Sequence, residues 1–136
     1  MKPDDRVRLR HIADALSAAI RFTEGRSRED LDKDEMLAFA LLHAIQIVGE
    51  AAVKVSAEFR DQHPLIPWAL ITGMRHRLVH AYFDINHDIL WTTATESVPE
   101  LLAQVESLPS LVGLKGYRDQ YVRASCSWRS WSQEVR

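Results

Sequence analysis

The sequence has little of several features on which whole classes of protein depend. Its 136 residues include one cysteine, Cys126, so a disulfide framework and a four-cysteine zinc site are both excluded. The longest unbroken apolar run has the seven residues Met36–Leu42, whereas a membrane-spanning helix needs ~20. No apolar segment follows the opening Met-Lys-Pro-Asp-Asp-Arg, so we expect no secretory signal. These absences predict a cytoplasmic protein that does not use a membrane.

A strong excess of one charge is also missing. Seventeen Lys and Arg stand against nineteen Asp and Glu, which gives a net charge of −2 and no sign of general affinity for nucleic acid. Residues 117–136 hold four arginines and two acidic residues, a local charge of +2, so the first 116 residues carry −4. Any binding of nucleic acid must therefore depend on a localised site.

The chain has five glycines and five prolines, and the segments between them have helical spacing. A first helix is predicted with Asp4 or Asp5 as its cap and Glu24-Gly25 at its end. From Asp34 a second helix is predicted, and we expect it to run until Pro64 stops it. Its apolar seam, spaced alternately by four and three, consists of Leu37, Leu41, Ala44, Val48, Ala51 and Val55. Further apolar residues widen this face, as a bundle centre or dimer surface requires: Ala40, Ile45, Ile47, Ala52 and Phe59.

A third predicted helix starts at Pro67 and keeps its apolar residues on or near one stripe: Trp68, Ile71, Met74, Leu78 and Tyr82. A break at 84–88 precedes a fourth helix over 87–95 and a fifth over 99–108. No repeat or strand-like alternation is present, so we predict an all-α fold, an up-and-down bundle of four to five helices over residues 1–112. Residues 113–136 mix Ser, Arg and Trp without helical period. We interpret them as a weakly ordered or partner-docked extension, with an RNA-binding arm as the alternative.

Side chains that can carry chemistry gather in the segment Arg75-His76-Arg77-Leu78-Val79-His80-Ala81-Tyr82. On one continuous helix Arg75 and His80 would be rotated by roughly 140° and separated by about 7.5 Å along the axis. They are therefore no obvious pair. Either the helix ends irregularly near His80, or the same segment of a second subunit completes the site.

Three interpretations of this segment are open on spacing alone. His76 and His80 share a helix face at the i, i+4 spacing of zinc ligands, but no third ligand is evident, with Asp84 and His87 only loosely placed. We therefore predict no metal site. A histidine that transfers protons and an arginine that neutralises phosphate suit RNA cleavage by the 2′-hydroxyl, without metal or cofactor. Spacing by itself favours the plainest interpretation, a helix end with solvated arginines and a histidine at the core edge.

The segment His-Pro-Leu-Ile-Pro-Trp-Ala-Leu-Ile-Thr-Gly-Met-Arg-His-Arg-Leu-Val-His-Ala-Tyr-Phe-Asp-Ile-Asn, residues 63–86, closely resembles the HepT-like toxin family of the HEPN superfamily. The motif Arg-x₄-His-x-Tyr is specific here because it lies between Ile-Pro-Trp and Tyr-Phe-Asp. Residues 45–52, Arg10-His-Ile, Phe22-x-Glu-Gly and Trp91 with Pro99-Glu-Leu are also similar, so the resemblance covers about residues 5–108.

The resemblance implies a helical homodimer with a composite active site at its interface. It implies a metal-independent endoribonuclease with RNA as substrate, the toxin of a type II toxin–antitoxin system, neutralised by a minimal nucleotidyltransferase antitoxin. By position, Arg75 would stabilise the scissile phosphate, His80 would transfer protons and Tyr82 would be adenylylated. His76 stands where the family usually has Asn or Asp. It is expected to support the site, together with Arg77 and Glu50, although Glu50 would also suit an ordinary solvated helix face.

Two other functions remain open from the sequence. The bundle would serve as a non-catalytic nucleotide-binding or substrate-recruiting subunit of a nucleotidyltransferase if the same groove only held a nucleotide. It would be a plain interaction module if Trp128 and Trp131 anchored a partner helix. In both cases Tyr82 would be an ordinary tyrosine at the core edge.

Overall fold

The computed structural model describes residues 2–81, 84–109 and 111. The helices are α1 (Pro3–Thr23), α2 (Asp30–Lys33), α3 (Glu35–Val53), α4 (Ala57–Gln62), α5 (Trp68–Leu78), α6 (His87–Thr92), the π-helical turn η1 (Thr93–Ser97) and α7 (Val98–Glu106). Two short strands, β1 (Val79–Ala81) and β2 (Asp84–Ile85), separate α5 from α6. The predicted all-α bundle is confirmed. The extension predicted over 113–136 lies outside the described residues.

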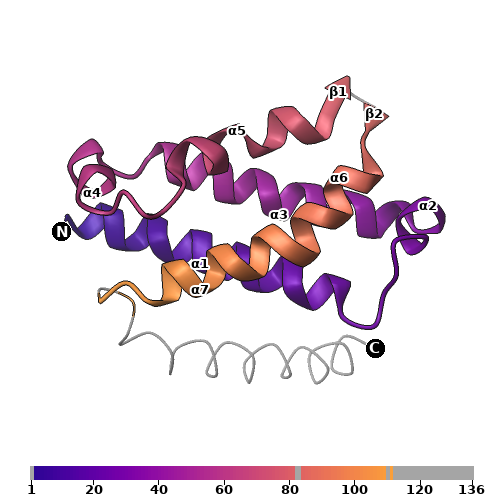
Figure 1. Cartoon of the computed structure of the whole chain (residues 1–136), viewed down its shortest axis with the longest axis horizontal. Helices are drawn as coiled ribbons and strands as arrows, with labels where there is room; N and C mark the ends of the chain where they lie inside the picture. The colour runs from indigo at the N-terminus through magenta and orange to yellow at the C-terminus, as the bar shows by residue number, and fades with distance from the viewer. Residues whose placement is uncertain (1, 82–83, 110, 112–136) are drawn as a thin grey trace, which may run out of the picture.

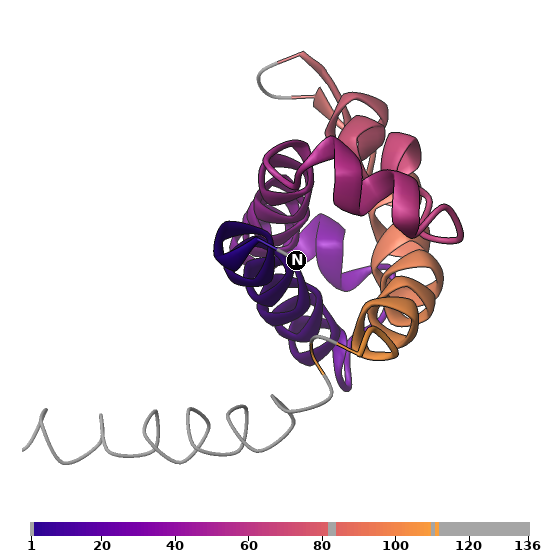
Figure 2. The same ribbon diagram turned by 90° about the vertical axis from the view of Figure 1, so that its left-hand side faces the viewer.

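The long helices run up and down the molecule in chain order (Figure 1). α3 packs between α1 and α5, and α7 packs against α1. In the end-on view of Figure 2 these helices surround a common core, and α2 lies at the end of the bundle away from the N-terminus. The largest fully buried side chains come from every long helix: Leu9, Ile12, Leu16, Leu41, Ile45, Val48, Ile71, Leu78, Leu90, Val98 and Val105.

The start of α3 follows the sequence prediction. Asp34 caps the helix, and its carboxylate accepts a hydrogen bond of 3.3 Å from the amide of Leu37. The predicted seam from Leu37 to Ala51 is buried throughout. By length and apolar composition α3 could cross a membrane, but the core helices of many soluble proteins meet the same two criteria. In this bundle 44% of that apolar window is buried, so packing in the core accounts for part of the composition.

The prediction that this helix runs to Pro64 is wrong. α3 ends at Val53, and Ser56 then starts a new helix by accepting a hydrogen bond from the amide of Phe59. Val55 and Phe59 are buried all the same, because the turn folds α4 back onto the core. The apolar spacing of the sequence therefore continues past Ser56, where a local cap ends the helical run and starts a new helix.

The predicted cap of α1 is also wrong. α1 begins after Lys2 without a side-chain cap, and Asp4 is exposed. Asp5 is buried, and its carboxylate accepts hydrogen bonds from the amide of Ser56 at 2.8 Å and from its hydroxyl at 2.6 Å. Asp5 therefore fixes the α3–α4 turn. The predicted end of α1 is confirmed, since the chain turns at Gly25 with a left-handed φ of 68°.

The fourth and fifth predicted helices form one continuous helical segment, which corrects the predicted break between them. α6 starts at the cap Asn86, whose side chain accepts a hydrogen bond from the amide of Ile89, and continues through η1 into α7. Pro99 lies near the start of α7. Its ring would clash with a carbonyl four residues earlier in a regular helix, and the wider π turn immediately before it relieves that conflict.

Candidate functional site at the end of α5

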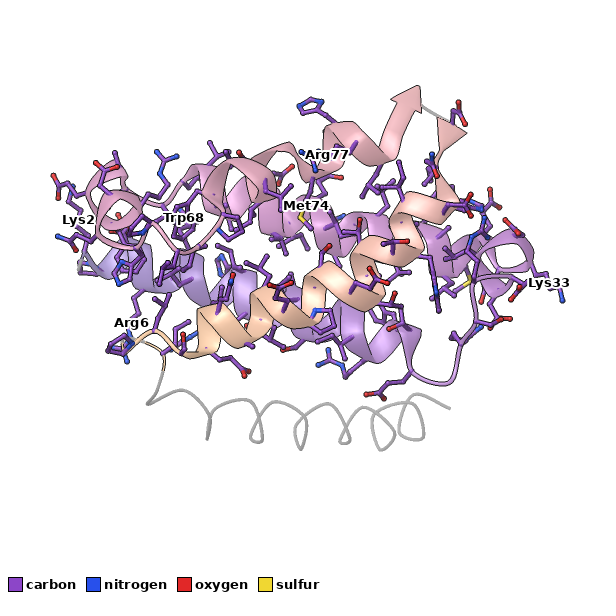
Figure 3. The ribbon with its side chains drawn as sticks, in the orientation of Figure 1. Lys2, Arg6, Lys33, Trp68, Met74 and Arg77 are labelled. Atoms are coloured by element: carbon purple, nitrogen blue, oxygen red, sulfur yellow. The ribbon has the colours of Figure 1, made fainter. Side chains whose placement is uncertain are left out.

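The last two turns of α5 separate buried apolar side chains from exposed basic ones. Ile71, Met74 and Leu78, spaced by three and four, are buried against the bundle. Arg75, His76 and Arg77 are exposed in the last turn, as Figure 3 shows for the labelled Arg77. Cations are favoured there because the carboxyl end of a helix carries partial negative charge.

The basic side chains of this turn are not paired with any of the residues that the structure describes. Within residues 2–81, 84–109 and 111, none of the side chains of Arg75, His76 and Arg77 makes a hydrogen bond or an ion pair. Arginine and histidine donors that are exposed and unpaired can bind a phosphate without first breaking another contact. The turn is thus an electropositive site on a chain of net negative charge.

The helix ends before His80, so the prediction that it continues through Tyr82 is wrong. Val79 adopts extended dihedral angles, φ −122° and ψ 112°, while its amide still donates to the carbonyl of Arg75. The chain then forms an antiparallel hairpin that projects from the bundle (Figures 1 and 2). The amide of Asn86 donates to the carbonyl of Leu78 at 2.9 Å and closes the base of this hairpin.

The hairpin has a bulge at His80. Val79 pairs with Ile85 and Ala81 pairs with Asp84, so His80 is an extra residue on β1 with no counterpart on β2. The sequence left two alternatives, an irregular helix end near His80 or completion of the site by a second subunit. The structure has the irregular helix end. His76 and His80 do not share a helix face, which corrects the predicted i, i+4 pair. Only the backbone of His80 is described, and Tyr82 lies outside the described residues.

Glu50 lies on α3, beside α5. A Cβ added to the preceding Gly49 would lie 3.5 Å from the carbonyl oxygen of Ile71, which shows how closely the two helices approach. The Glu50 carboxylate is exposed and accepts a hydrogen bond of 2.9 Å from the side-chain amide of Gln46. In the described part of the chain no hydrogen bond or ion pair joins it to Arg75.

Below the hairpin lies a polar clasp that sequence reasoning missed. Arg28 donates from Nε to Asp88 at 2.7 Å and from Nη1 to Asp32 at 3.0 Å, and His87 contacts Asp32 at 2.8 Å. The hydrogen bond from His87, followed by that from Arg28, lowers the pKa of Asp32. The clasp ties α2 to the start of α6. The contacts of Arg28 with Asp88 and of His87 with Asp32 join residues 60 and 55 positions apart in the chain, so no local pattern announces them.

Metal-ligating side chains do not cluster in this region. Over the described ranges, no group of three or more His, Cys, Asp or Glu residues is placed to hold a metal ion. The geometry at the end of α5 instead offers cationic donors, which bind anions such as phosphate.

A family model described as "Ribonuclease HepT-like" matches residues 12–108. The chain belongs to the HepT-like ribonuclease family. The matched part includes the whole of α5, the hairpin and the clasp residues, so the basic turn lies inside the part of this HepT-like chain that matches the family.

Named relatives of this HepT-like chain are also described as ribonucleases. "Putative RNase TTE0752" of Caldanaerobacter subterraneus subsp. tengcongensis is 39% identical over 74% of this chain and 89% of its own length. "Probable ribonuclease HepT" of Thermococcus cleftensis is 36% identical over 79% of this chain and 98% of its own length. "Putative RNase MJ1380" of Methanocaldococcus jannaschii is 31% identical over 77% of this chain and 96% of its own length. No solved structure matches the chain significantly.

Proposed function

We propose that this HepT-like chain is a metal-independent endoribonuclease and the toxin of a toxin–antitoxin pair, acting in the cytoplasm as a homodimer. The observation that carries the proposal is the unpaired basic turn of α5, followed within two residues by a bulged strand with His80. It lies inside the segment that matches a ribonuclease family. Bulges are frequent beside active sites, where they redirect one residue of a strand.

The proposed reaction needs only groups of the protein and the RNA. The 2′-oxygen of the substrate bonds to phosphorus while the bond from phosphorus to the 5′-oxygen breaks. Arg75 stabilises the negative charge that builds on the phosphoryl oxygens. The 2′-hydroxyl gives its proton to His80 of one chain, and the departing 5′-oxygen takes a proton from His80 of the other chain of the proposed homodimer. His76 and Arg77 support the site from the same turn. Glu50, on the neighbouring helix α3, is proposed as an orienting residue for the site.

The homodimer is supported by apolar side chains that the bundle leaves exposed on one side of α3. Met36 and Phe39 near its start and Val53 at its end are 81%, 53% and 60% exposed and lie within about 100° of one another around the helix, with the polar residues His43, Gln46 and Glu50 between them. Large exposed apolar side chains on a helix that also carries polar groups are typical of interaction surfaces. Glu50 lies on the same face, next to α5, so pairing of two α3 faces would bring the two basic turns toward one interface.

The proposed antitoxin is a minimal nucleotidyltransferase that adenylylates Tyr82, two residues beyond His80. An added phosphate there would compete with RNA for the cationic donors of α5 and so silence the toxin. Incubation with ATP and the transferase should raise the mass of the wild-type chain by whole AMP units. Tyr82→Phe should stay unmodified, and labelling of that variant to the same extent would refute the assignment.

The ribonuclease proposal is tested by single substitutions assayed on RNA in the presence of EDTA. Arg75→Ala and His80→Ala should each lower the cleavage rate by roughly 10²-fold or more, because each removes a group that acts in the transition state. Arg21→Ala, an exposed arginine at the far end of α1, is the matched control and should cleave like wild type. Undiminished cleavage by both active-site variants, or its loss in EDTA for wild type, would contradict the proposal.

A further inference from the structure

A groove separate from the basic turn lies between α4 and α5. It has a volume of about 500 Å³ and is lined by Ala57, Arg60, Asp61, Trp68, Ala69 and Thr72. Sites for small ligands and nucleotides are of this size. None of the lining residues belongs to the catalytic set proposed above, and no sequence motif singled them out together.

Arg60 is the chemically unusual residue of this groove. Its Nε atom is buried and has no hydrogen-bond partner, and its guanidinium makes no ion pair with any residue of the described ranges. A buried donor left unpaired costs free energy, so contacts within the described ranges do not explain the position of Arg60, whose side chain lines the groove. The planar guanidinium offers several donors in a fork that matches the oxygens of a phosphate. The neighbouring Asp61 is exposed, and its carboxylate could accept a hydrogen bond from a ribose hydroxyl.

Trp68 supplies a rigid aromatic ring in the same groove. Its indole N–H donates to the carbonyl of His63 at 3.0 Å, and its ring packs edge-on against Phe59, with ring centroids 6.3 Å apart. These contacts fix the ring, which is partly buried against the core and still lines the groove. Figure 3 shows Trp68 at the end of α5 remote from Arg77. Fixed, accessible aromatic rings stack on bases whatever the base.

The groove leads directly to the basic turn. Trp68, Thr72 and Arg75 follow one another at i, i+4 and i+7, so all three lie on one face of α5. At ~1.5 Å per residue, Trp68 and Arg75 are about 10 Å apart along the helix axis. A single strand of RNA that reaches from the groove to Arg75 would need only a nucleotide or two to do so.

We propose that this groove is an RNA subsite, in which Arg60 binds a phosphate and Trp68 stacks on the base of a nucleotide flanking the scissile bond. The proposal rests on the ribonuclease function proposed above. It extends that function along the helix and assigns the α4–α5 turn a part in holding substrate. Because every base has a stacking face and every nucleotide a phosphate, the subsite binds RNA with little regard to sequence.

The test measures binding apart from cleavage. The probe is a fluorescein-labelled, random-sequence 12-mer of 2′-O-methyl RNA, which lacks the attacking hydroxyl, and its anisotropy is followed at several salt concentrations. Arg60→Gln should raise Kd about tenfold, since it removes a charge-assisted contact. It should also lower the slope of log Kd against log salt by about 0.7, the value for one phosphate contact on a single strand. Arg21→Gln, the matched control, should change neither quantity.

Two further variants guard against a trivial loss of structure. Arg60→Lys keeps the cation and should keep the salt slope, while Thr72→Glu places a carboxylate in the groove without touching Arg60 and should weaken binding as Arg60→Gln does. Circular dichroism confirms that each variant is folded. A Kd and a salt slope that Arg60→Gln and Thr72→Glu both leave at their wild-type values would overturn the subsite.

Cleavage kinetics separate this proposal from the one on which it rests. Arg60→Gln should raise KM severalfold and leave kcat near wild type, because its contact is made equally in the ground and transition states. If wild type cleaves RNA and Arg60→Gln changes neither KM nor Kd, the subsite is refuted and the ribonuclease stands. If wild type binds RNA through Arg60 but cleaves none, the ribonuclease is refuted and the subsite stands.

Discussion

Asp5 shows how one buried carboxylate can hold two helices at a fixed angle. It lies in the first turn of α1, is 3% exposed, and receives both the amide and the hydroxyl of Ser56. Burial raises the pKa of Asp5, but the two hydrogen bonds from Ser56, aided by the charge of Lys2, outweigh this effect and bring the pKa below its ordinary value of 3.8. The carboxylate is therefore more stable in the folded chain than in the unfolded one.

Replacing Asp5 by Asn should lower the free energy of unfolding by about 1–3 kcal/mol, because a charged acceptor of two buried hydrogen bonds is lost. Since the pKa is lower in the folded state, the stabilisation is complete above the ordinary value of 3.8 and is lost as the pH falls through the folded value. Urea titrations at pH 7 and pH 3 should thus show a smaller difference between variant and wild type at pH 3. Asp4→Asn, on an exposed neighbour, is the control, and an equal effect of both substitutions would contradict this account.

The sequence names Asp5 as important but predicts the wrong partner. A helix cap is a local contact, and an acidic residue at the start of a helix is its commonest sign. The true partner, Ser56, is 51 residues away and comes into reach only when α1 and α3 pack. Asp34 does cap the helix that follows it, as the sequence predicts, because its partner Leu37 lies only three residues away. The cap by Ser56 is just as local, but sequence reasoning missed it because the apolar spacing continues across it.

At the scale of the element, the junction of α5 with the hairpin decides where the motif residues lie. The helix ends at Leu78 because the next residues, Val79–Ala81, pair with the strand Asp84–Ile85. The amide of Asn86 also donates a hydrogen bond to the carbonyl of Leu78. Apolar spacing alone carries the helix on to Tyr82. The separation of Arg75 and His80 allows an irregular end near His80 only as one of two alternatives, because the strand pairing that ends the helix leaves no mark in the spacing. The clasp of Arg28, Asp32, His87 and Asp88 then holds α6, into which the hairpin leads.

Asp32→Asn should loosen this junction, since Asp32 accepts from both Arg28 and His87 in the clasp. We expect faster hydrogen exchange of backbone amides in residues 84–92, measured by mass spectrometry at neutral pH, and little change in α1. Glu29→Gln is the matched control, because Glu29 is an exposed acid on the same segment and outside the clasp. Exchange that is equal in the two variants would show that the clasp does not restrain α6.

At the scale of the whole molecule, one bundle leaves part of its apolar surface uncovered. The sequence predicted the wide apolar face of α3, and most of it is core, as the buried seam shows. The side chains of Met36, Phe39 and Val53 remain exposed, because the helices packed against α3 do not cover them. Whether such a surplus faces solvent or a second subunit depends on the packing of helices that are distant in sequence, so composition alone does not decide it.

The double substitution Met36→Glu with Phe39→Glu should convert the proposed dimer into a monomer, because two pairs of carboxylates would face one another across an apolar interface. Light scattering coupled to gel filtration measures the mass, and RNA cleavage should fall at least tenfold with it. Leu65→Glu changes an equally apolar side chain, 90% exposed, away from α3 and should leave the mass unchanged. A double variant that keeps the wild-type mass and activity would exclude this face as the interface.

The described side chains from Val79 to Ile89 all lie outside the buried core, although Leu78 and Leu90 on either side belong to it. Substitution of the exposed side chains in this segment should therefore cost the bundle little stability, whereas Asn86, His87 and Asp88 cap α6 or hold it in the clasp. A chain that loses the proposed ribonuclease activity through a change at such an exposed position should still fold. If two chains share each active site, as proposed, such inactive chains should pair with active ones and lower their activity.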